Sequence, residues 1–335
     1  MKTTLPTHEL LQMLTYRRPH GSSGEKMFID KYIKPLGVNP IGLIGETLGY
    51  VGDPAAYYKV IMMPDGTVSR TMFSCHTDTV HQDDTMQQVI YDPTKQTVYK
   101  TDGAPLGADD GAGMWLMMQM IRAGVPGTYM FHRGEERGGI GSSHIAAHHT
   151  PMLKGYDRAI AFDRKATFSI ITHQEHGRCC SESFATNLSD RLNDLMPDDA
   201  FAPDNGGIFT DTANYTDDIA ECTNVSCGYY NEHTERELLD VAFLVRLTEA
   251  CIQLDWEKLP VVRTPGEREV VADWPWLLDS GWGLGSKSFK DDAVVTVEEY
   301  LGMSEDDIDD MCWDSPEAAS TLLAELKGYF VAETN

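Results

Sequence analysis

The sequence predicts an α/β fold with a mixed central sheet, helices on both faces and no inserted lid domain, followed by a small acidic C-terminal subdomain. Three observations lead to this prediction. Short apolar segments alternate with segments of helical periodicity up to about residue 256, which is typical of a sheet covered on both faces. Hydrophobic residues make up 41% of the 335 residues, enough for a substantial core. After Trp256 the composition changes, and prolines and a glycine mark a linker.

The chain begins with two predicted helices. Apolar residues at helical spacing follow a threonine cap over residues 7–17. Ser22 or Ser23 can cap the second helix, over residues 24–35, and Gly37 ends it.

Strands and helices then alternate. Strands are predicted at 58–63, 68–75, 128–132, 158–162, 207–210 and 219–226. A hairpin is predicted over 87–101, with Asp92-Pro93 at its turn. Further helices are predicted at 111–123, 142–149, 181–195 and 235–256.

The C-terminal part has a distinct character. Residues 265–335 contain 17 acidic and four basic residues, so they carry a net charge of −13 out of −25 for the chain. They also contain four of the six tryptophans and predicted helices at 296–302 and 316–330. We therefore expect a first domain of residues 1–258 and an acidic, tryptophan-containing extension of residues 259–335, packed on or beside it.

The charge and the cysteines restrict the partners and the compartment. A net charge of −25 disfavours nucleic acid and anionic membranes as the main partner. There is neither a signal-peptide pattern nor an apolar run of the ~20 residues that span a bilayer. Seven cysteines without a C-x-x-C pair favour a reduced, cytoplasmic protein, with a small Cys222–Cys227 disulfide as the alternative.

Five polar clusters stand beside the predicted strands, and they carry the candidate chemistry. Their sequences are Ser-Cys-His76-Thr-Asp78, Gly-Ala-Asp109-Asp110-Gly, Gly-Glu135-Glu136-Arg, Phe-Asp163-Arg and Tyr229-Tyr230-Asn-Glu-His233. Ligands of an open α/β sheet bind beyond the carboxyl ends of the strands, so these side chains are predicted to converge. Converging carboxylates repel one another unless cations lie between them.

Two histidines and three carboxylates are suitable ligands for Zn²⁺, and one further carboxylate can act as a general base. Each cluster taken alone also has a structural explanation, such as a surface ion pair, a turn or a solvated helix end. Their occurrence in order, each at a strand end, favours the metal site.

In their residues and order, the five clusters resemble the motifs of the co-catalytic dizinc exopeptidases. This superfamily includes peptidase T, the bacterial leucyl aminopeptidases and the glutamate carboxypeptidases, and the similarity extends over residues 68–240. It implies two Zn²⁺ ions, with Co²⁺ or Mn²⁺ as alternatives. By resemblance, His76 and Asp163 bind one ion, Glu136 and His233 bind the other, and Asp109 bridges both.

The resemblance implies further roles. Glu135 resembles the general base that acts on a hydroxide shared by the zinc ions, and Asp78 resembles the acid that orients the first histidine ligand. Tyr229 or Tyr230 is the candidate donor to the oxyanion, although half-buried packing explains both tyrosines equally well.

Two implications concern the backbone and the domain structure. The resemblance implies a cis peptide bond between Asp109 and Asp110. In relatives with a lid, on the order of a hundred residues are inserted between the positions of Asp163 and His233. Only 70 positions separate them here, which favours the single-domain aminopeptidase type, although the Asp-Asp segment looks more like peptidase T.

The leading hypothesis is an aminopeptidase that removes N-terminal residues from short peptides. The alternative with the same chemistry is a carboxypeptidase or N-acyl amino acid deacylase, since Arg133, Arg137 and Arg164 flank the motifs and could bind a carboxylate. A non-catalytic binding protein on the same scaffold is the second alternative. The sequence leaves the oligomeric state open.

Overall fold

The computed structural model describes residue 5 and residues 7–42, 54–174 and 177–267. All of these lie in the first of two compact units, Met1–Val270. The helices expected at 296–302 and 316–330, and most of the acidic extension, lie outside the described residues.

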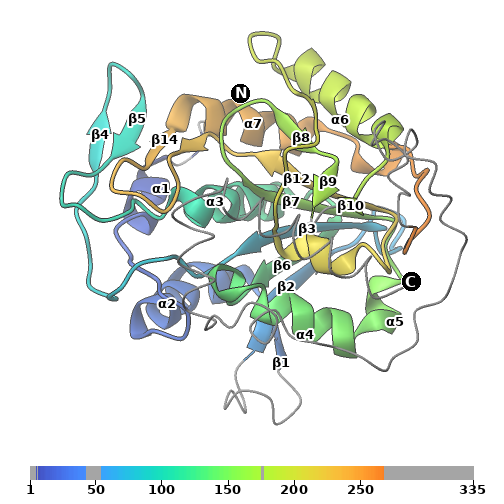
Figure 1. Cartoon of the computed structure of the whole chain (residues 1–335), viewed down its shortest axis with the longest axis horizontal. Coiled ribbons are helices and arrows are strands. Elements are labelled where there is room, and N and C mark those ends of the chain that lie inside the picture. Colours follow the sequence, from blue (N-terminus) through green and yellow to red (C-terminus); the bar gives the residue numbers. More distant parts are fainter. Residues whose placement is uncertain (1–4, 6, 43–53, 175–176, 268–335) are drawn as a thin grey trace, which may run out of the picture. The chain divides into compact units, whose positions relative to one another are not determined.

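An eight-stranded mixed sheet forms the centre of this unit (Figure 1). In spatial order its strands are β1 (Asn39–Gly42), β2 (Pro54–Ile61), β6 (Gly127–His132), β3 (Thr71–His76), β7 (Arg158–Arg164), β12 (Glu221–Ser226), β8 (Ser169–Ile171) and β11 (Ala202–Asp204). The four central strands β6, β3, β7 and β12 run parallel. Their carboxyl ends therefore meet at one edge of the sheet.

Two smaller sheets accompany the main one. Four antiparallel strands pair in the order β13 (Tyr229–Tyr230), β14 (Leu238–Asp240), β5 (Thr97–Tyr99) and β4 (Ile90–Asp92). The pairing of β4 with β5 confirms the predicted hairpin. A two-stranded ribbon consists of β9 (His173–Gln174) and β10 (Gly177–Arg178).

Helices cover both faces of the main sheet. One apolar cluster includes residues of α1 (Thr7–Met13), α2 (Ser23–Phe28), α3 (Ala108–Ala123), α6 (Glu182–Leu195) and α7 (Val241–Gln253). A second includes residues of α4 (Ile140–His148), α5 (Thr150–Leu153) and the 3₁₀ turn Asp211–Tyr215. Figure 1 shows α6 and α7 on one side of the sheet and α4 and α5 on the other. None of the described helices is long and apolar enough to cross a membrane.

The alternation of side chains along β3 explains the two cores. Phe73 packs against Tyr129, Phe162 and Trp256, with ring centroids 5.1, 6.0 and 5.0 Å away. The preceding residue, Met72, belongs to the second cluster, and both side chains are fully buried. Successive residues of a strand point to opposite faces, and all six residues of β3 are buried, so both faces need helices. The predicted α/β fold is confirmed.

Several predicted boundaries differ from the structure. The helix predicted at 235–256 begins only at Val241, because residues 238–240 pair with β5 as β14. The strand predicted at 207–210 is a loop. At Gly207 an added Cβ would lie 2.2 Å from the carbonyl oxygen of His173, so the loop depends on a glycine there. Cys222 and Cys227 are free and buried, so the alternative disulfide is wrong.

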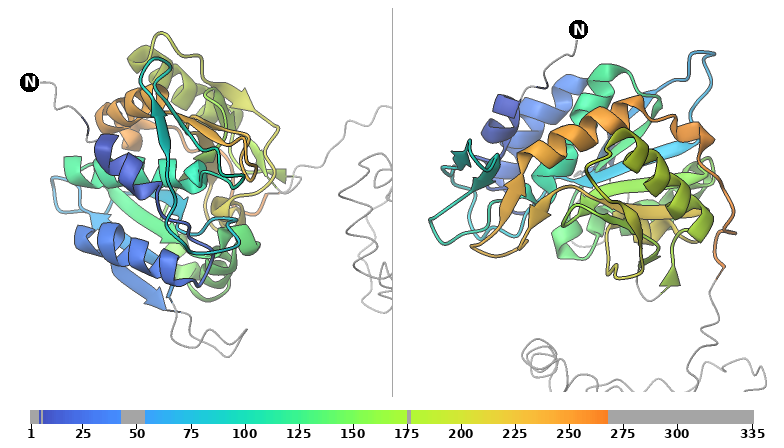
Figure 2. Two further views of the ribbon diagram at one scale, coloured as in Figure 1. Left: turned by 90° about the vertical axis from the view of Figure 1, so that its left-hand side faces the viewer. Right: turned by 90° about the horizontal axis from the view of Figure 1, so that it is seen from above.

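The segment between Asp163 and His233 belongs to the main fold. It contributes β8, α6, β11 and β12, and Figure 2 shows α6 beside α7. The described residues therefore contain no inserted lid domain in this interval, as the sequence predicted.

The chain continues to pack on the first unit after residue 258. Leu259 is buried, and the guanidinium of Arg263 donates hydrogen bonds to the carbonyl oxygens of Ala220 and Ile219, at 2.6 and 2.9 Å. The amides of Val262 and Arg263 both donate to the carboxylate of Glu221. The boundary of the extension stays a prediction.

Candidate metal centre

The predicted ligands converge at the carboxyl edge of the parallel strands. His76 is the last residue of β3, Asp163 lies in β7, and Asp109 lies in the first turn of α3. Glu136 follows β6 in a 3₁₀ turn, and His233 follows β13.

Asp109 lies between the two imidazoles. Its Oδ1 is 3.0 Å from Nε2 of His76, and its Oδ2 is 3.2 Å from Nε2 of His233. Nε2 of His76 also lies 3.3 Å from Oδ1 of Asp163, and Nε2 of His233 lies 3.1 Å from Oε2 of Glu136. The five residues thus form two groups that share one carboxylate.

The electrostatics of the two groups favour positive charge. Burial lowers the pKa of His76, but the charge of Asp163 and a hydrogen bond to Asp109 outweigh it and raise the pKa well above its usual value. Hydrogen bonds to Asp109 and Glu136 raise the pKa of His233 to about 11. Burial, and then the charge of Asp109, raise the pKa of Glu136 to about 7. The carboxylates therefore hold protons or cations between them.

The donors fit divalent cations of the zinc type. Nδ1 of His76 lies 3.2 Å from the carbonyl oxygen of Asp78, which leaves Nε2 facing the carboxylates. Oε1 of Glu136 is buried and has no hydrogen-bond partner within the described part of the chain. Imidazole nitrogen and carboxylate oxygen are ordinary zinc ligands. A cation nearby would stabilise a buried carboxylate oxygen that has no hydrogen-bond partner.

Glu135 lies beside this arrangement. Its Oε2 is 3.9 Å from Nε2 of His76, and its side chain is 13% exposed. Burial raises its pKa well above the usual value, even though the charge of His76 lowers it. A carboxyl group with a raised pKa can accept a proton near neutral pH, as a general base requires.

Asp78 organises the turn that carries both glutamates. Its carboxylate accepts hydrogen bonds from the amides of Gly134, Glu135 and Glu136, at 2.9, 3.2 and 3.2 Å. Its Oδ1 lies 3.7 Å from Nδ1 of His76. The acid expected to orient the histidine therefore also holds the glutamate turn.

The peptide bond between Asp109 and Asp110 is cis, as the resemblance implied. The carboxylate of Asp110 is fully buried and accepts hydrogen bonds from the amides of His76 and Gly113, at 3.3 and 2.9 Å. Asp110 thus holds the end of β3 beside the start of α3.

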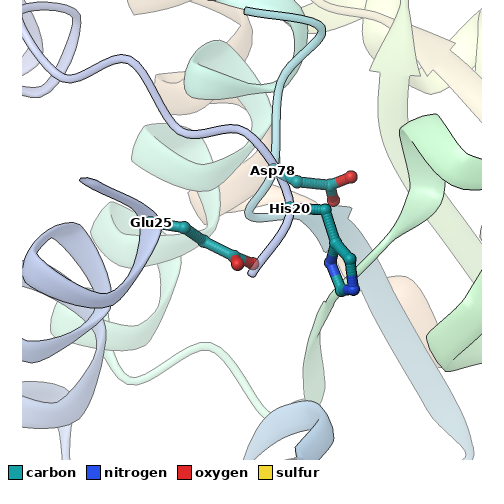
Figure 3. Close-up of side chains that lie close together, drawn as sticks. All are labelled: His20, Glu25 and Asp78. Atoms are coloured by element: carbon teal, nitrogen blue, oxygen red, sulfur yellow. The ribbon is translucent and has the colours of Figure 1, made fainter. Parts of the chain in front are cut away.

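A third cluster lies behind Asp78. Figure 3 shows His20, from the segment after α1, and Glu25, from α2, beside Asp78. Both carboxylate oxygens of Glu25 accept hydrogen bonds from the guanidinium of Arg133, at 2.9 and 2.6 Å. The guanidinium already supplies the positive charge here, so this cluster is a structural ion pair.

A cavity of about 240 Å³ opens beside the two groups. Asp109, Glu135 and Asp163 line it together with Tyr229, whose hydroxyl donates to Oδ1 of Asp163 at 3.2 Å. The hydroxyl of Tyr230 donates instead to Thr167, and Tyr230 does not line the cavity. Of the two candidate tyrosines, only Tyr229 is at the site.

The cationic residues near the motifs have different surroundings. Arg164 and Lys165 line the cavity, and Lys165 forms an ion pair with Glu232 at 2.5 Å. Arg133 is bound by Glu25, as described above, and neither Arg133 nor Arg137 lines the cavity. Arg164 is therefore the one of the three predicted arginines that a ligand in the cavity would contact.

Two buried residues at the site were missed by the sequence analysis. The carboxylate of Glu237 binds the backbone of residues 106–109, and the guanidinium of Arg18 donates to the carbonyl oxygens of Thr77 and Gly107. An acid four residues after a candidate ligand is a weak signal for Glu237. Nothing in the sequence around Arg18 indicates that it is buried.

No protein-family model and no curated protein matches the sequence, but solved structures match the fold. Aminopeptidase PepT from Bacillus cereus superposes with a TM-score of 0.56 at 14% identity, over 73% of this chain and 96% of that one. A tripeptidase from Staphylococcus aureus gives 0.57 at 14% identity, over 74% and 96%. LapA aminopeptidase from Legionella pneumophila gives 0.51 at 15% identity, over 77% and 69%.

The chain shares the fold of these peptidases. The fold implied by the resemblance to the co-catalytic exopeptidases is thereby confirmed, and the candidate metal centre lies within it. At these identities the likeness concerns the peptidase fold alone, so the function rests on the geometry of the site.

Proposed function

We propose that the protein is a metal-dependent aminopeptidase that removes N-terminal residues from short peptides. One observation carries the proposal: Asp109 presents one carboxylate oxygen to each imidazole, at 3.0 and 3.2 Å, so two cation positions would share this residue. The peptidase fold of the structural neighbours supports it.

The ligands divide into two sets around the shared carboxylate. His76 and Asp163 would hold one cation, and Glu136 and His233 would hold the other. Two divalent cations at such positions polarise a scissile carbonyl and make a water molecule more acidic. Zn²⁺ is the proposed metal, with Co²⁺ and Mn²⁺ as substitutes, because the donors are imidazole nitrogens and carboxylate oxygens.

Glu135 would move the proton. Its carboxylate lines the cavity but belongs to neither set around Asp109, so it stays available to the substrate. As general base it takes a proton from the attacking water, and as general acid it delivers that proton to the leaving amine. Asp78 keeps Glu135 in place through the amides of the turn.

The cavity supports recognition of a free amino group. Gln174 lines it and is 4% exposed, and its Oε1 has no hydrogen-bond partner among the described residues. Glu232 adds a further carboxylate to the wall, where one of its oxygens pairs with Lys165. A substrate ammonium group donates hydrogen bonds to such acceptors, whereas an N-acylated end cannot carry the charge.

Hydrolysis of a free tripeptide and of its N-acetylated form tests the proposal. The purified protein should cleave the free tripeptide from its N-terminus, lose this activity with a chelator, and regain it with Zn²⁺, Co²⁺ or Mn²⁺. The acetylated tripeptide should remain intact.

The other outcomes identify the alternatives. Faster hydrolysis of the acylated substrate would indicate the deacylase or carboxypeptidase reaction, in which Arg164 binds a carboxylate. Binding of peptide and metal without hydrolysis would indicate the non-catalytic protein.

A further inference from the structure

Glu237 makes an unusual set of hydrogen bonds to one segment of backbone. Its Oε2 accepts from the amides of Leu106 and Gly107, at 2.8 and 3.0 Å. Its Oε1 accepts from the amides of Ala108 and Asp109, at 2.7 and 3.0 Å. The residue is 2% exposed, so the four amides replace the water that a buried carboxylate would otherwise require.

This segment ends at the carboxylate that the two cation positions share. The fourth amide bound by Glu237 belongs to Asp109 itself. On the carbonyl side, Nη2 of the buried Arg18 donates to the oxygen of Gly107 at 3.1 Å, and Nε donates to the oxygen of Thr77 at 2.9 Å. The backbone that leads into Asp109 is therefore held through its N–H groups by Glu237 and through one of its carbonyl groups by Arg18.

Glu237 also belongs to the turn that carries His233. The amide of Glu237 donates to the carbonyl oxygen of Thr234 at 3.1 Å, and His233 has the left-handed φ of 63°. Residues 233–237 thus supply both the imidazole of His233, which lies beside Asp109, and the carboxylate of Glu237, which binds the Asp109 amide. A displacement of Glu237 would change the 3.2 Å separation between His233 Nε2 and Asp109 Oδ2.

We propose that Glu237 is a positioning residue of the metal centre: by binding the four amides of residues 106–109, it sets the distance between Asp109 and His233. This inference rests on the proposed function for the role of Asp109 as a shared ligand. Groups that support ligands in this way commonly contribute about 10- to 100-fold to metal affinity.

The chain contains a matched control for a purely structural carboxylate. Glu221 is also fully buried and also accepts four hydrogen bonds: from the amide and hydroxyl of Ser181 and from the amides of Val262 and Arg263. None of its four bonds involves a candidate metal ligand. Glutamine in place of either glutamate removes one acceptor oxygen at nearly constant volume.

The experiment compares Glu237→Gln and Glu221→Gln with the wild-type protein. Each full-length protein is stripped with a chelator, its thermal unfolding is recorded, and Zn²⁺ is titrated against a competing chromophoric chelator. Hydrogen–deuterium exchange of the stripped proteins gives a second readout, which needs neither metal nor activity.

We expect Glu237→Gln to weaken zinc binding about 10- to 100-fold and to speed exchange of amides 106–109 roughly tenfold. Glu221→Gln should lower thermal stability to a similar extent, with zinc affinity and exchange at 106–109 as in the wild type. Equal zinc affinity in the two variants, or unchanged exchange at 106–109 in Glu237→Gln, would overturn the proposal. A protein that binds zinc but cleaves no peptide would contradict the proposed function instead, while the zinc and exchange comparison would still decide the role of Glu237.

Discussion

Glu135 and Glu136 are neighbours in the sequence, yet their carboxylates have different surroundings. Oε2 of Glu136 lies 3.1 Å from Nε2 of His233, within one of the two ligand sets. The imidazole nearest to Glu135 is that of His76, at 3.9 Å, and the Glu135 carboxylate faces the cavity. We therefore propose separable roles for these adjacent residues, although both carboxylates lie near His76.

Glutamine at each position should separate metal binding from hydrolysis. Glu135→Gln removes the proposed proton carrier, so we expect a loss of about 10²- to 10⁴-fold in kcat with Zn²⁺ affinity retained. Glu136→Gln removes a proposed ligand, so Zn²⁺ affinity should fall first. Metal titration and peptide hydrolysis on both proteins measure this. Full activity of metal-loaded Glu135→Gln would refute the assigned mechanism.

Cation binding should depend on pH because protons and cations compete for the same imidazole nitrogens. The pKa of His233 is raised to about 11, and that of His76 is also raised well above its usual value, so protons are strong competitors at both histidines. A ligand nitrogen must be neutral, so binding releases protons. Zn²⁺ affinity should therefore rise from pH 6 to 8, about tenfold per pH unit for each proton released.

Calorimetry in buffers of different ionisation enthalpy counts the released protons. The expected signal is a binding heat that changes with the buffer. A zinc affinity that stays constant between pH 6 and 8 would contradict the protonation of both imidazoles.

At the scale of elements, α7 begins where a side chain caps it. The carboxylate of Asp240 accepts a hydrogen bond from the amide of Phe243 at 2.9 Å, and the preceding residues pair with β5. The sequence contains this capping signal, but the apolar residues 238 and 239 fit a helical pattern equally well. Strand pairing with a segment about 140 positions earlier in the chain decided the boundary.

Asp240→Ala should destabilise the protein by about 1 kcal/mol, because the first turn of α7 loses its cap. Asp255→Ala is the control, since Asp255 is half exposed and only forms a surface ion pair with Lys258. Urea denaturation of both variants measures the difference. An equal effect of the two substitutions would show that the cap contributes nothing.

The close contact of α3 with β7 gives a second prediction at this scale. An added Cβ at Gly113 would lie 1.9 Å from the carbonyl oxygen of Phe162 and 2.5 Å from Oδ1 of Asp110. Gly113→Ala should therefore cost about 1–3 kcal/mol or more, and it should also weaken Zn²⁺ binding by displacing the start of α3. Gly42→Ala, with no atom of the described residues within 4 Å of the added Cβ, should have little effect on either measurement.

The candidate metal ligands could be predicted from the sequence, whereas the residues that hold their backbone, Glu237 and Arg18, could not. The reason is physical. His76 and Asp163 stand at the ends of parallel strands, and the topology of such a sheet brings these ends together. Glu237 and Arg18 act through hydrogen bonds to backbone that is 59 to 131 positions away in the chain. Partners so far apart have no local pattern, so only the folded structure reveals them.

At the scale of the molecule, residues after the predicted boundary at 258 also contact the described fold. The guanidinium of Arg158 donates a hydrogen bond to the carbonyl oxygen of Leu259 at 2.5 Å, and that of Arg263 donates one to the carbonyl oxygen of Ala220 at 2.6 Å. Both guanidinium groups are largely buried. The segment 259–267 is therefore part of the structure that holds β7 and β12.

Two truncations test this extension of the first domain. A chain that ends at residue 267 keeps these contacts and should retain its fold, its Zn²⁺ binding and its hydrolysis. A chain that ends at 258 loses the buried Leu259 and leaves Arg158 without that acceptor, so it should be less stable by about 2–5 kcal/mol. Thermal unfolding compares the two, and equal stability would support the predicted boundary at 258.

The two imidazoles of the metal centre differ in their access to water: the side chain of His76 is 1% exposed, and that of His233 is 49% exposed. A competing chelator reaches an exposed ligand more easily than a buried one. The two proposed cations should therefore leave in sequence, the one at His233 within a short dialysis and the one at His76 far more slowly. Partial removal followed by a different metal would then give a protein with two unlike ions in a defined order.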